Sequence, residues 1–272
     1  GQTVADAGVP GGHTGRIAGG IVTDQPSMAP VLGRAMRLDG SPGTFIDLGL
    51  FHLGDRFSVE AWVNLDPDAV HNPSYHAIVA RWDGSFELDL APGDRVNLVV
   101  RNQSNAFGLV ASPAPLDRGR WHHLVGSYEG GLLRLFIDRT NAATVSFPGA
   151  LRNGGPVPDR VLIGATRDGV KASFQWKGLI DEIALYNYAL SPLQVAAHYQ
   201  AATQPLVTLS MFQPGLVSWP ANDPAFVLQS TDTLSEPVEW RDVPDQPFLQ
   251  GSFAGVLVKA QQGQKFYRLM RR

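Results

Sequence analysis

The chain has 272 residues, of which 44% are hydrophobic and 17% charged, so it is long enough for two domains and apolar enough to bury a core. Its 29 glycines and 20 prolines make turns frequent and argue against a helix bundle. A formal net charge of −3, with no run of lysine or arginine, excludes the clustered positive charge that nucleic-acid binding requires. The absence of cysteine excludes disulfides, thiolate metal sites and a cysteine nucleophile. No stretch approaches the roughly 20 apolar residues of a membrane-spanning helix, so we expect no transmembrane segment.

Most of the chain has the pattern of short strands. Alternating or β-branched runs bounded by Gly, Pro, Asn and Asp recur about every 8–12 residues, which is typical of a β-sandwich or barrel. The expected strands cover residues 35–39, 44–50, 56–65, 75–82, 85–90, 95–101, 107–111, 120–128, 132–138, 143–147, 160–164 and 177–186. Asp83-Gly84 and Glu129-Gly130-Gly131 are hairpin signals between neighbouring runs.

One helix is expected after Ser191. This serine is an N-cap before a proline, and Gln194 completes a capping box. Leu193, Ala196 and Ala197 form one short apolar stripe. We expect about two to three turns of helix at the edge of the sandwich.

The residue pattern of the sequence changes after Ala202. Thr203-Gln204-Pro205 has the composition of a linker, and the tail beyond it holds short runs typical of strands, with acids and bases in balance. We therefore predict an all-β protein with one short helix. Its domains are a β-sandwich of residues 1–202 and a small β domain of residues 203–272.

Several segments of the first domain carry a family likeness in their order and spacing. They are Ala35–Gly40, Phe45–Leu48, Phe57–Val63, Gly119–Val125 with Leu133–Asp138, and Gly178–Ile183 with Tyr186–Ser191. Together they resemble the laminin-G-like jelly-roll domains of the concanavalin-A-like lectin/glucanase superfamily. The resemblance implies a jelly-roll β-sandwich.

The tail resembles the small β modules that end many exported bacterial proteins. Phe226–Thr231, Trp240 and Lys265–Leu269 carry this likeness, and by analogy we expect a secreted or cell-surface protein of a bacterium. The first domain departs from its family in two ways. No Trp-containing strand precedes Val4-Ala5-Asp6, so we expect that either an edge strand is missing or another segment or chain supplies it. Asp138-Arg139 also stands where the family favours Asp-Gly, so we expect a different turn there.

Glycoside hydrolysis is the enzymatic alternative, because this fold hosts glucanases. Those enzymes resemble one another in a Glu-x-Asp-x-x-Glu strand. Glu87 and Asp89 match the first two acids, but Pro92 stands at the third position and cannot act as acid or nucleophile. A mechanism with two carboxylates therefore lacks a partner. We interpret the two acids as the polar end of a strand before a turn, and we expect no catalysis.

The histidines do not form a recognisable metal site. His122 and His123 point to opposite faces of a strand, so one metal ion cannot bind both, and a packing or hydrogen-bonding role is expected. His71 and His76 would need a third zinc ligand that the sequence does not locate.

Calcium is the metal that the family resemblance implies. The residues that match the family's ligands are Asp39 and Gly40, through their backbone carbonyls, and the aspartate Asp181. Oxygen ligands of this kind suit Ca²⁺. The alternative is that Asp181 caps a turn or pairs with a nearby arginine.

The candidate sugar-binding residues surround exposed aromatic groups. Trp82 lies at a strand end between Arg81 and Asp83, where an apolar ring flanked by charged groups suits a sugar, and Trp176 is a second exposed candidate. Polar residues on the concave sheet complete the candidate set, namely Asn97, Arg101 and Asn102. The alternatives are that the tryptophans are partly core and that the polar residues form a solvated face. By contrast, Trp62 and Trp121 are expected in the core between the sheets.

We therefore expect a non-catalytic extracellular recognition module with a structural calcium ion. Its expected partner is a carbohydrate, either a glycan or a cell-surface polysaccharide, bound on the concave face and its rim loops. The alternative is a structural or accessory subunit of a surface assembly, held by protein–protein contacts and without a glycan ligand. Nucleic acid is not expected as a partner.

Overall fold

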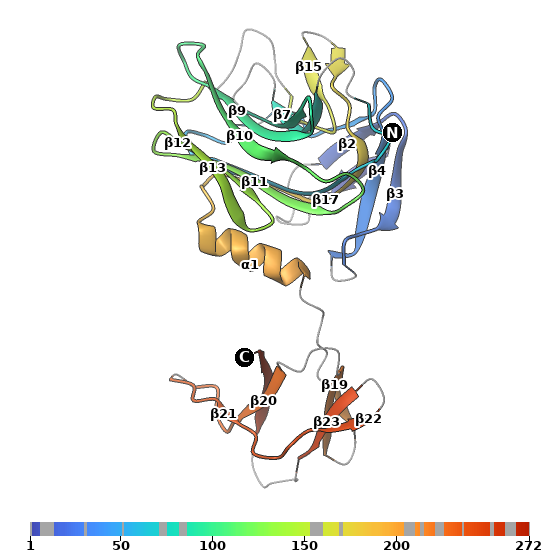
Figure 1. Cartoon of the computed structure of the whole chain (residues 1–272), viewed down its shortest axis with the longest axis vertical. Coiled ribbons are helices and arrows are strands. Elements are labelled where there is room, and N and C mark those ends of the chain that lie inside the picture. Colours follow the sequence, from blue (N-terminus) through green and yellow to red (C-terminus); the bar gives the residue numbers. More distant parts are fainter. Residues whose placement is uncertain are drawn as a thin grey trace. The chain divides into compact units, whose positions relative to one another are not determined.

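The structure is a computed structural model of the chain (Figure 1). It describes residues 2–5, 14–29, 32–50, 52–70, 75–81, 86–152, 160–168, 171–203, 210–212, 215–220, 226–235, 237–250, 253–258 and 265–271. The chain forms two compact units, Gly1–Gln204 and Pro205–Arg272. The division between them falls two residues beyond the boundary expected from the sequence.

The first unit is a sandwich of two antiparallel sheets (Figure 1). The eight-stranded sheet has the order β1 (Thr3–Ala5), β2 (Thr14–Ala18), β5 (Phe45–Asp47), β14 (Leu162–Ile163), β7 (His76–Arg81), β8 (Phe86–Ala91), β9 (Arg95–Arg101) and β10 (Phe107–Pro115). The seven-stranded sheet has the order β13 (Thr140–Ser146), β12 (Leu132–Ile137), β11 (His122–Glu129), β6 (Phe57–Leu65), β17 (Lys177–Tyr186), β4 (Arg34–Asp39) and β3 (Ile21–Pro26). A separate hairpin, drawn in yellow in Figure 1, consists of β15 (Thr166–Asp168) and β16 (Lys171–Ser173). Its strand β15 contacts β7.

Two tight turns connect the strands at one edge of the seven-stranded sheet. Gly130 and Gly131 both have positive φ, as a two-residue hairpin between β11 and β12 requires, and this predicted hairpin is confirmed. Asp138 and Arg139 also have positive φ, 47° and 67°, although neither is glycine. The Asp138 carboxylate accepts a hydrogen bond of 2.9 Å from the backbone N–H of His123, which holds this turn in place.

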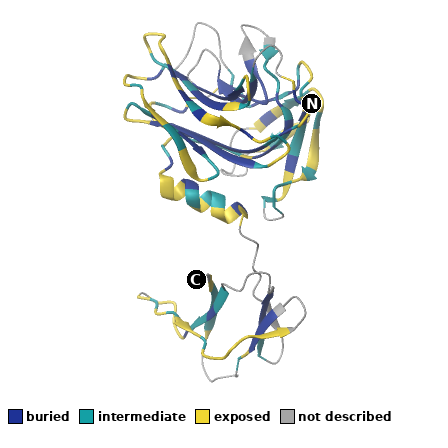
Figure 2. Ribbon diagram, viewed as in Figure 1, coloured by how far each residue is buried: buried dark blue, intermediate teal, exposed yellow. Residues whose placement is uncertain are grey.

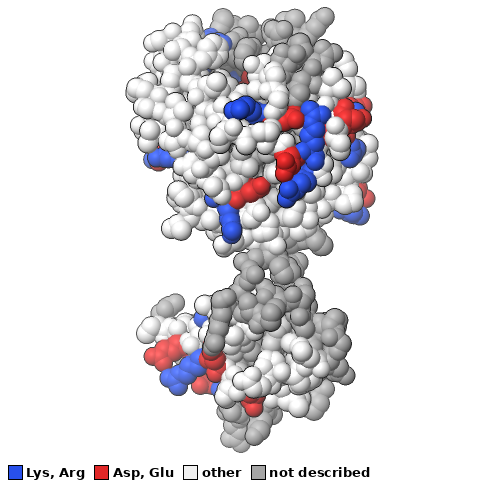
Figure 3. All heavy atoms as spheres, viewed as in Figure 1, with Lys and Arg blue, Asp and Glu red and all other residues white. Residues whose placement is uncertain are grey.

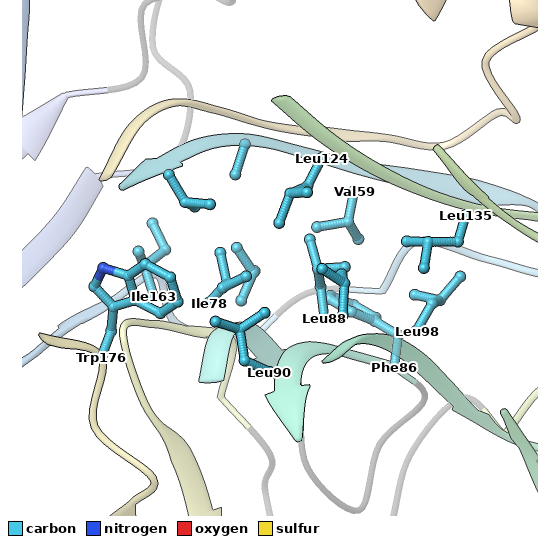
Figure 4. Packing of buried hydrophobic residues seen from close by; sticks show 14 of the residues in the cluster. Val59, Ile78, Phe86, Leu88, Leu90, Leu98, Leu124, Leu135, Ile163 and Trp176 are labelled. Carbon is cyan, nitrogen blue, oxygen red and sulfur yellow. The ribbon is translucent and has the colours of Figure 1, made fainter. Parts of the chain in front are cut away.

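The hydrophobic core lies between the two sheets (Figure 4). Alternate residues of each strand point inward, and the large side chains that fill the middle are Phe57, Val59, Ile78, Phe86, Leu88, Leu90, Leu98, Leu124, Leu135, Ile163 and Trp176. Burial of each such side chain contributes about 1.5–3 kcal/mol relative to exposure. The sheets approach closely at Gly126, where an added Cβ would lie 2.8 Å from Leu98 Cδ1. These contacts confirm the predicted all-β jelly-roll sandwich.

Helix α1 (Pro192–Thr203) begins at the predicted cap. The Ser191 hydroxyl accepts a hydrogen bond from the backbone N–H of Gln194 and donates one to the Gln194 side-chain Oε1. The predicted apolar stripe is wrong: Leu193 is 83% exposed, and Val195 and Ala202 are the buried residues (Figure 2). The helix covers the outer face of the seven-stranded sheet instead of the sandwich edge, since Val195 packs with Val125, Phe136 and Leu190.

The second unit has two small antiparallel sheets and its own core. One sheet has the order β18 (Ser210–Phe212), β19 (Leu216–Pro220), β23 (Phe253–Leu257) and β22 (Phe248–Gln250), and the other has the order β21 (Arg241–Asp242), β20 (Phe226–Thr231) and β24 (Phe266–Arg271). The core consists of Val217, Trp219, Leu228, Ala254 and Val256. The predicted small C-terminal β fold is confirmed.

Charges of opposite sign are interspersed on the face of each unit that Figure 3 shows. Among the ion pairs of the first unit are Arg118 with Asp94 at 2.8 Å and Lys177 with Asp68 at 2.7 Å. Within the described part of the chain, no helix has the length and apolar character needed to cross a membrane.

Candidate ligand-binding face

The outer face of the eight-stranded sheet carries the residues of interest, and we call it the open face. On β9, Val96, Leu98 and Val100 point into the core, so Asn97 and Arg101 point to the open face. The register extends this face across the sheet. Glu87 of β8 lies opposite Val99 of β9, which lies opposite Leu109 of β10.

An exposed apolar surface occupies the β9–β10 part of the open face. We call it the shelf, and it consists of Val99, Arg101, Phe107 and Leu109. Phe107 is 55% exposed and Leu109 is 49% exposed, although both lie within a regular strand. The guanidinium carbon of Arg101 lies 4.3 Å from the centroid of the Phe107 ring. A flat apolar surface next to a planar hydrogen-bond donor can stack against a sugar ring and bind its hydroxyls.

The turn beside the shelf is internally hydrogen-bonded. The side-chain oxygen of Asn102 accepts hydrogen bonds from the N–H groups of Ser104 and Ala106, at 3.0 and 2.9 Å. Arg152 donates to the side chain of Asn105 at 2.7 Å. Asn102 was predicted as a ligand contact, and the structure shows that its carbonyl oxygen shapes this turn.

Two other predicted contacts are buried. Asn97 donates to Asp89 Oδ1 at 3.1 Å, so it does not belong to a solvated polar face. Arg81 lies at the end of β7, where its Nη1 is 2.7 Å from His52 Nδ1. Burial and the Arg81 charge lower the pKa of His52. Trp82 and Asp83 lie outside the described residues, so their predicted role stays a prediction.

The prediction that Trp176 is exposed is wrong. Its side chain is completely buried between the sheets, next to Ile163 in Figure 4. Its backbone N–H donates to the carbonyl of Gly164 at 2.8 Å. Trp62 was expected between the sheets, and this prediction is wrong as well. Its ring stacks on His123 and Tyr199 at the outer face of the seven-stranded sheet, beneath α1. Trp121 is only partly buried and does not belong to the core cluster.

The acids of β8 are not a solvated strand end. Glu87 is 5% and Asp89 2% exposed, and both side chains lie on the open face. Burial raises the pKa of Glu87 to about 7, although the nearby Thr166 side chain opposes the shift. Burial and the neighbouring Glu87 raise the pKa of Asp89 well above its ordinary value, which the hydrogen bond from Asn97 only partly offsets. Burial thus favours the protonated form of both carboxyls.

The predicted calcium ligands do not come together. Lys177 of β17 lies opposite Asp39 of β4, so Asp181 is four positions further along β17, or about 13 Å away. Ser41 and Thr44 donate hydrogen bonds to Asp39. The described residues include no group of three or more His, Asp or Glu side chains that could hold a metal ion.

The surroundings of Asp181 match the alternative interpretation. Its carboxylate accepts hydrogen bonds from the Ser27 hydroxyl and from the N–H of Glu182, which has a positive φ of 46°. Asp181 thus fixes a local bend in β17 and links it to the end of β3. Asp39, Gly40 and Asp181 do not fit one Ca²⁺ ion in this arrangement.

Calcium should therefore not stabilise the first unit through these residues. We expect the melting temperatures in millimolar calcium and in chelator to agree within about 1 °C, because an ion without a site shifts no folding equilibrium. Differential scanning calorimetry of the wild type and of Asp181→Asn makes the comparison. A calcium-dependent rise that Asp181→Asn abolishes would show that the ion does bind there.

The outer face of the seven-stranded sheet holds a polar cluster around Glu60. Its carboxylate accepts hydrogen bonds from His123 Nε2 at 2.6 Å, the Tyr186 hydroxyl at 2.8 Å and His198 Nδ1 at 3.0 Å. Burial alone would raise the pKa of Glu60, but the bonds from His123 and Tyr186 and the charges of the two histidines outweigh it and lower the pKa. The hydrogen-bonding role predicted for His123 is what the structure shows.

The sequence reasoning missed Phe107 and Leu109. Both belong to a strand predicted at residues 107–111, but that prediction does not say which of its side chains point inward and which point outward. Its inward residues are Gly108 and Val110, so the large apolar side chains of Phe107 and Leu109 alternate outward. Large apolar residues on both faces of an outer strand were the signal that could have found the shelf.

The fold is that of a concanavalin A-like β-sandwich. Residues 39–196, more than half of the chain, match the laminin G family of the concanavalin A-like lectin/glucanases superfamily. The chain belongs to this family. No curated protein matches it.

Solved structures share the fold at low sequence identity. Domain 4 of the extracellular arabinanase AbnA from Geobacillus stearothermophilus, solved with arabinotriose, aligns with a TM-score of 0.50 and 21% identity over 67% of this chain and 82% of that domain. The binding domain of Paraclostridial mosquitocidal protein 1 aligns with a TM-score of 0.56 and 10% identity over 87% of this chain. The botulinum neurotoxin serotype G binding domain aligns with a TM-score of 0.55 and 13% identity over 94% of it. The alignments span 60% and 62% of these two toxin domains.

Proposed function

We propose that the chain is a non-catalytic carbohydrate-binding module that works outside the cell and holds a sugar on the shelf. The observation that carries this proposal is the exposed ring of Phe107 with the Arg101 guanidinium against it. Leu109 extends the apolar surface along β10. Contiguous exposed apolar patches on soluble domains often mark the surface that a ligand or partner contacts.

Proteins of the same fold support the choice of ligand. The arabinanase domain was solved with an arabinose trisaccharide, and the two toxin domains are described as binding domains. These likenesses are to the fold, so they supply an analogy, and the geometry of the shelf supplies the position. An extracellular setting follows the same analogy.

The acids on β8 favour binding over hydrolysis. Glycosidases place two carboxylates on either side of an accessible bond. Glu87 and Asp89 are both buried on one strand, and Pro92 stands where a third acid would be. We therefore include no catalytic step in the proposed function.

Replacing Phe107 with alanine should abolish sugar binding or weaken it by at least about fivefold, because loss of one stacking aromatic costs about 1–3 kcal/mol at a binding site. Stability should change little, since the ring is more than half exposed. A glycan array with the purified chain identifies a sugar, and titration calorimetry then compares the variants.

The matched control is Leu193→Ala, which removes an even more exposed side chain from helix α1 on the other sheet. This variant should bind as the wild type does. Sugar binding that survives Phe107→Ala would remove the shelf as the site. An array without any bound sugar, together with elution of the chain far above 29.4 kDa, would favour the alternative of an assembly subunit.

A further inference from the structure

The outer face of the three-stranded sheet in the second unit carries a row of polar side chains. On β20, Leu228 belongs to the core of this unit, so the next residue, Gln229, points outward. Gln229 lies opposite Asp242 of β21 on one side and opposite Arg268 of β24 on the other. Side chains opposite each other on neighbouring strands share one face of a sheet, so the three residues form a row across β21, β20 and β24.

Hydrogen bonds hold the row in one arrangement. Gln229 Nε2 donates to Asp242 Oδ1 at 2.8 Å, and Arg268 Nε donates to Gln229 Oε1 at 2.9 Å. The Gln229 amide is thereby fixed between a carboxylate and a guanidinium. An amide and a guanidinium carry more N–H groups than these two bonds use, and a carboxylate has several acceptor positions, so the row can also bind hydroxyl groups.

Trp240 adds an aromatic ring to the row. It directly precedes β21, and the guanidinium carbon of Arg268 lies 4.4 Å from the centroid of its ring. The side chain of Trp240 is only partly buried. Val227 and Met270 lie opposite each other on the same face of the sheet, and Met270 is 46% exposed. This face thus combines an aromatic ring, aliphatic surface and polar groups in fixed positions.

The first unit has a similar combination on the shelf. There the guanidinium carbon of Arg101 lies 4.3 Å from the centroid of the Phe107 ring, also on the outer face of an antiparallel sheet. In both places the arginine restrains the ring and presents N–H groups beside it, so a sugar can contact apolar surface and form hydrogen bonds at once. The row also contains the Asp242 carboxylate, which accepts hydrogen bonds from hydroxyls and would repel an acidic sugar.

We propose that Trp240, Gln229, Arg268 and Asp242 form a second carbohydrate-binding site, so that one chain has two contacts with a neutral polysaccharide. We call these four residues the second site. Its position stands on the contacts above, whereas the choice of carbohydrate as its ligand rests on the proposed function. Two sites in one chain retain a repeating polymer more strongly than either site does alone, because the second contact forms at a high effective concentration.

Binding of the full chain to insoluble polysaccharides tests the second site. The probes are cellulose, chitin, xylan and arabinan, and depletion isotherms give the apparent affinity for each. Phe107→Ala removes the ring of the shelf, and this variant should still bind at least one of the four polymers measurably. Adding Trp240→Ala should weaken the remaining binding by at least about fivefold, because aromatic rings are commonly the hot spots of a binding surface.

The matched control is Arg241→Ala in the same Phe107→Ala background. Arg241 is exposed and precedes Asp242 on β21, but it lies opposite Ser230 and points to the other face of the sheet. This variant should bind as its background does. If circular dichroism shows that Trp240→Ala does not fold, Asp242→Ala keeps the ring and should still weaken binding by at least about threefold.

The two sites give different outcomes when either fails. The second site is overturned by wild-type binding to none of the four polymers, by complete loss of binding in Phe107→Ala alone, or by equal binding with and without the Trp240 ring. Phe107→Ala that binds as the wild type does, with binding lost in Trp240→Ala, would remove the shelf and support the second site.

Discussion

Replacing Trp176 with alanine should lower the free energy of unfolding of the first unit by about 3–5 kcal/mol, the usual loss for truncating a large buried aromatic side chain. The side chain is fully enclosed between the two sheets, so its removal leaves a cavity where β17 begins. The edge-on contact with the His76 ring, whose centroid lies 6.3 Å from that of the indole, would also be lost. Urea denaturation followed by circular dichroism measures the change.

The matched variant is Trp176→Phe, which keeps an aromatic ring in the same place. The indole Nε1 of Trp176 is buried without a hydrogen-bond partner among the described atoms, so phenylalanine loses volume and no hydrogen bond. We expect a cost of only about 1–2 kcal/mol. A loss below about 1 kcal/mol for Trp176→Ala would contradict the enclosed position, because exposed side chains change stability by no more than about 0.5 kcal/mol.

The tryptophans show where strand patterns stop being informative. Alternation around Trp62 was recognised, and Ala61 and Val63 do point into the core. Trp62 must then point outward, and only the covering helix α1, more than 120 residues later, makes it buried. Trp176 directly precedes strand β17 and stands between two polar residues, so the local sequence does not show that its side chain is in the core. Residues distant in the sequence therefore decide how both tryptophans are buried.

The fold was predictable because its signals are local in the sequence. The hairpin at Gly130-Gly131 and the helix cap at Ser191 depend on residues within a few positions, and the structure has both. Many such local signals agree with one antiparallel sandwich, and agreement across levels is what specifies a fold. The candidate site depends on which face of β10 carries Phe107 and Leu109, and a short apolar run does not by itself assign that face.

The two buried glutamates differ in their donors. Glu60 receives hydrogen bonds from His123, Tyr186 and His198, so its charged form is stabilised and its pKa is lowered. At Glu87 burial outweighs the opposing effect of the Thr166 side chain, so its pKa is raised to about 7. Ionisation therefore supports folding at Glu60 and opposes it at Glu87. The ionisation of these two carboxyls therefore affects stability in opposite directions.

Replacing Glu60 with glutamine should cost about 2–3 kcal/mol of folding free energy at pH 7, because hydrogen bonds to a buried charge are lost and at least one donor is left unpaired. The native pKa of Glu60 lies below the ordinary value of 4.5, so its contribution is fully present above pH 4.5 and is lost as the pH falls through the native pKa. The stability of the variant and that of the wild type should therefore converge in acid.

Urea denaturation at pH 7 and at pH 3.5 measures this convergence. Glu129→Gln is the control for loss of an acid on the same sheet, since Glu129 is exposed, and it should change stability by less than about 0.5 kcal/mol at pH 7. A cost of Glu60→Gln that stayed equal at both pH values would mean that the Glu60 charge contributes nothing. The cluster would then stabilise the packing of α1 through shape alone, because the aromatic contacts of Trp62 with His123 and Tyr199 do not depend on that charge.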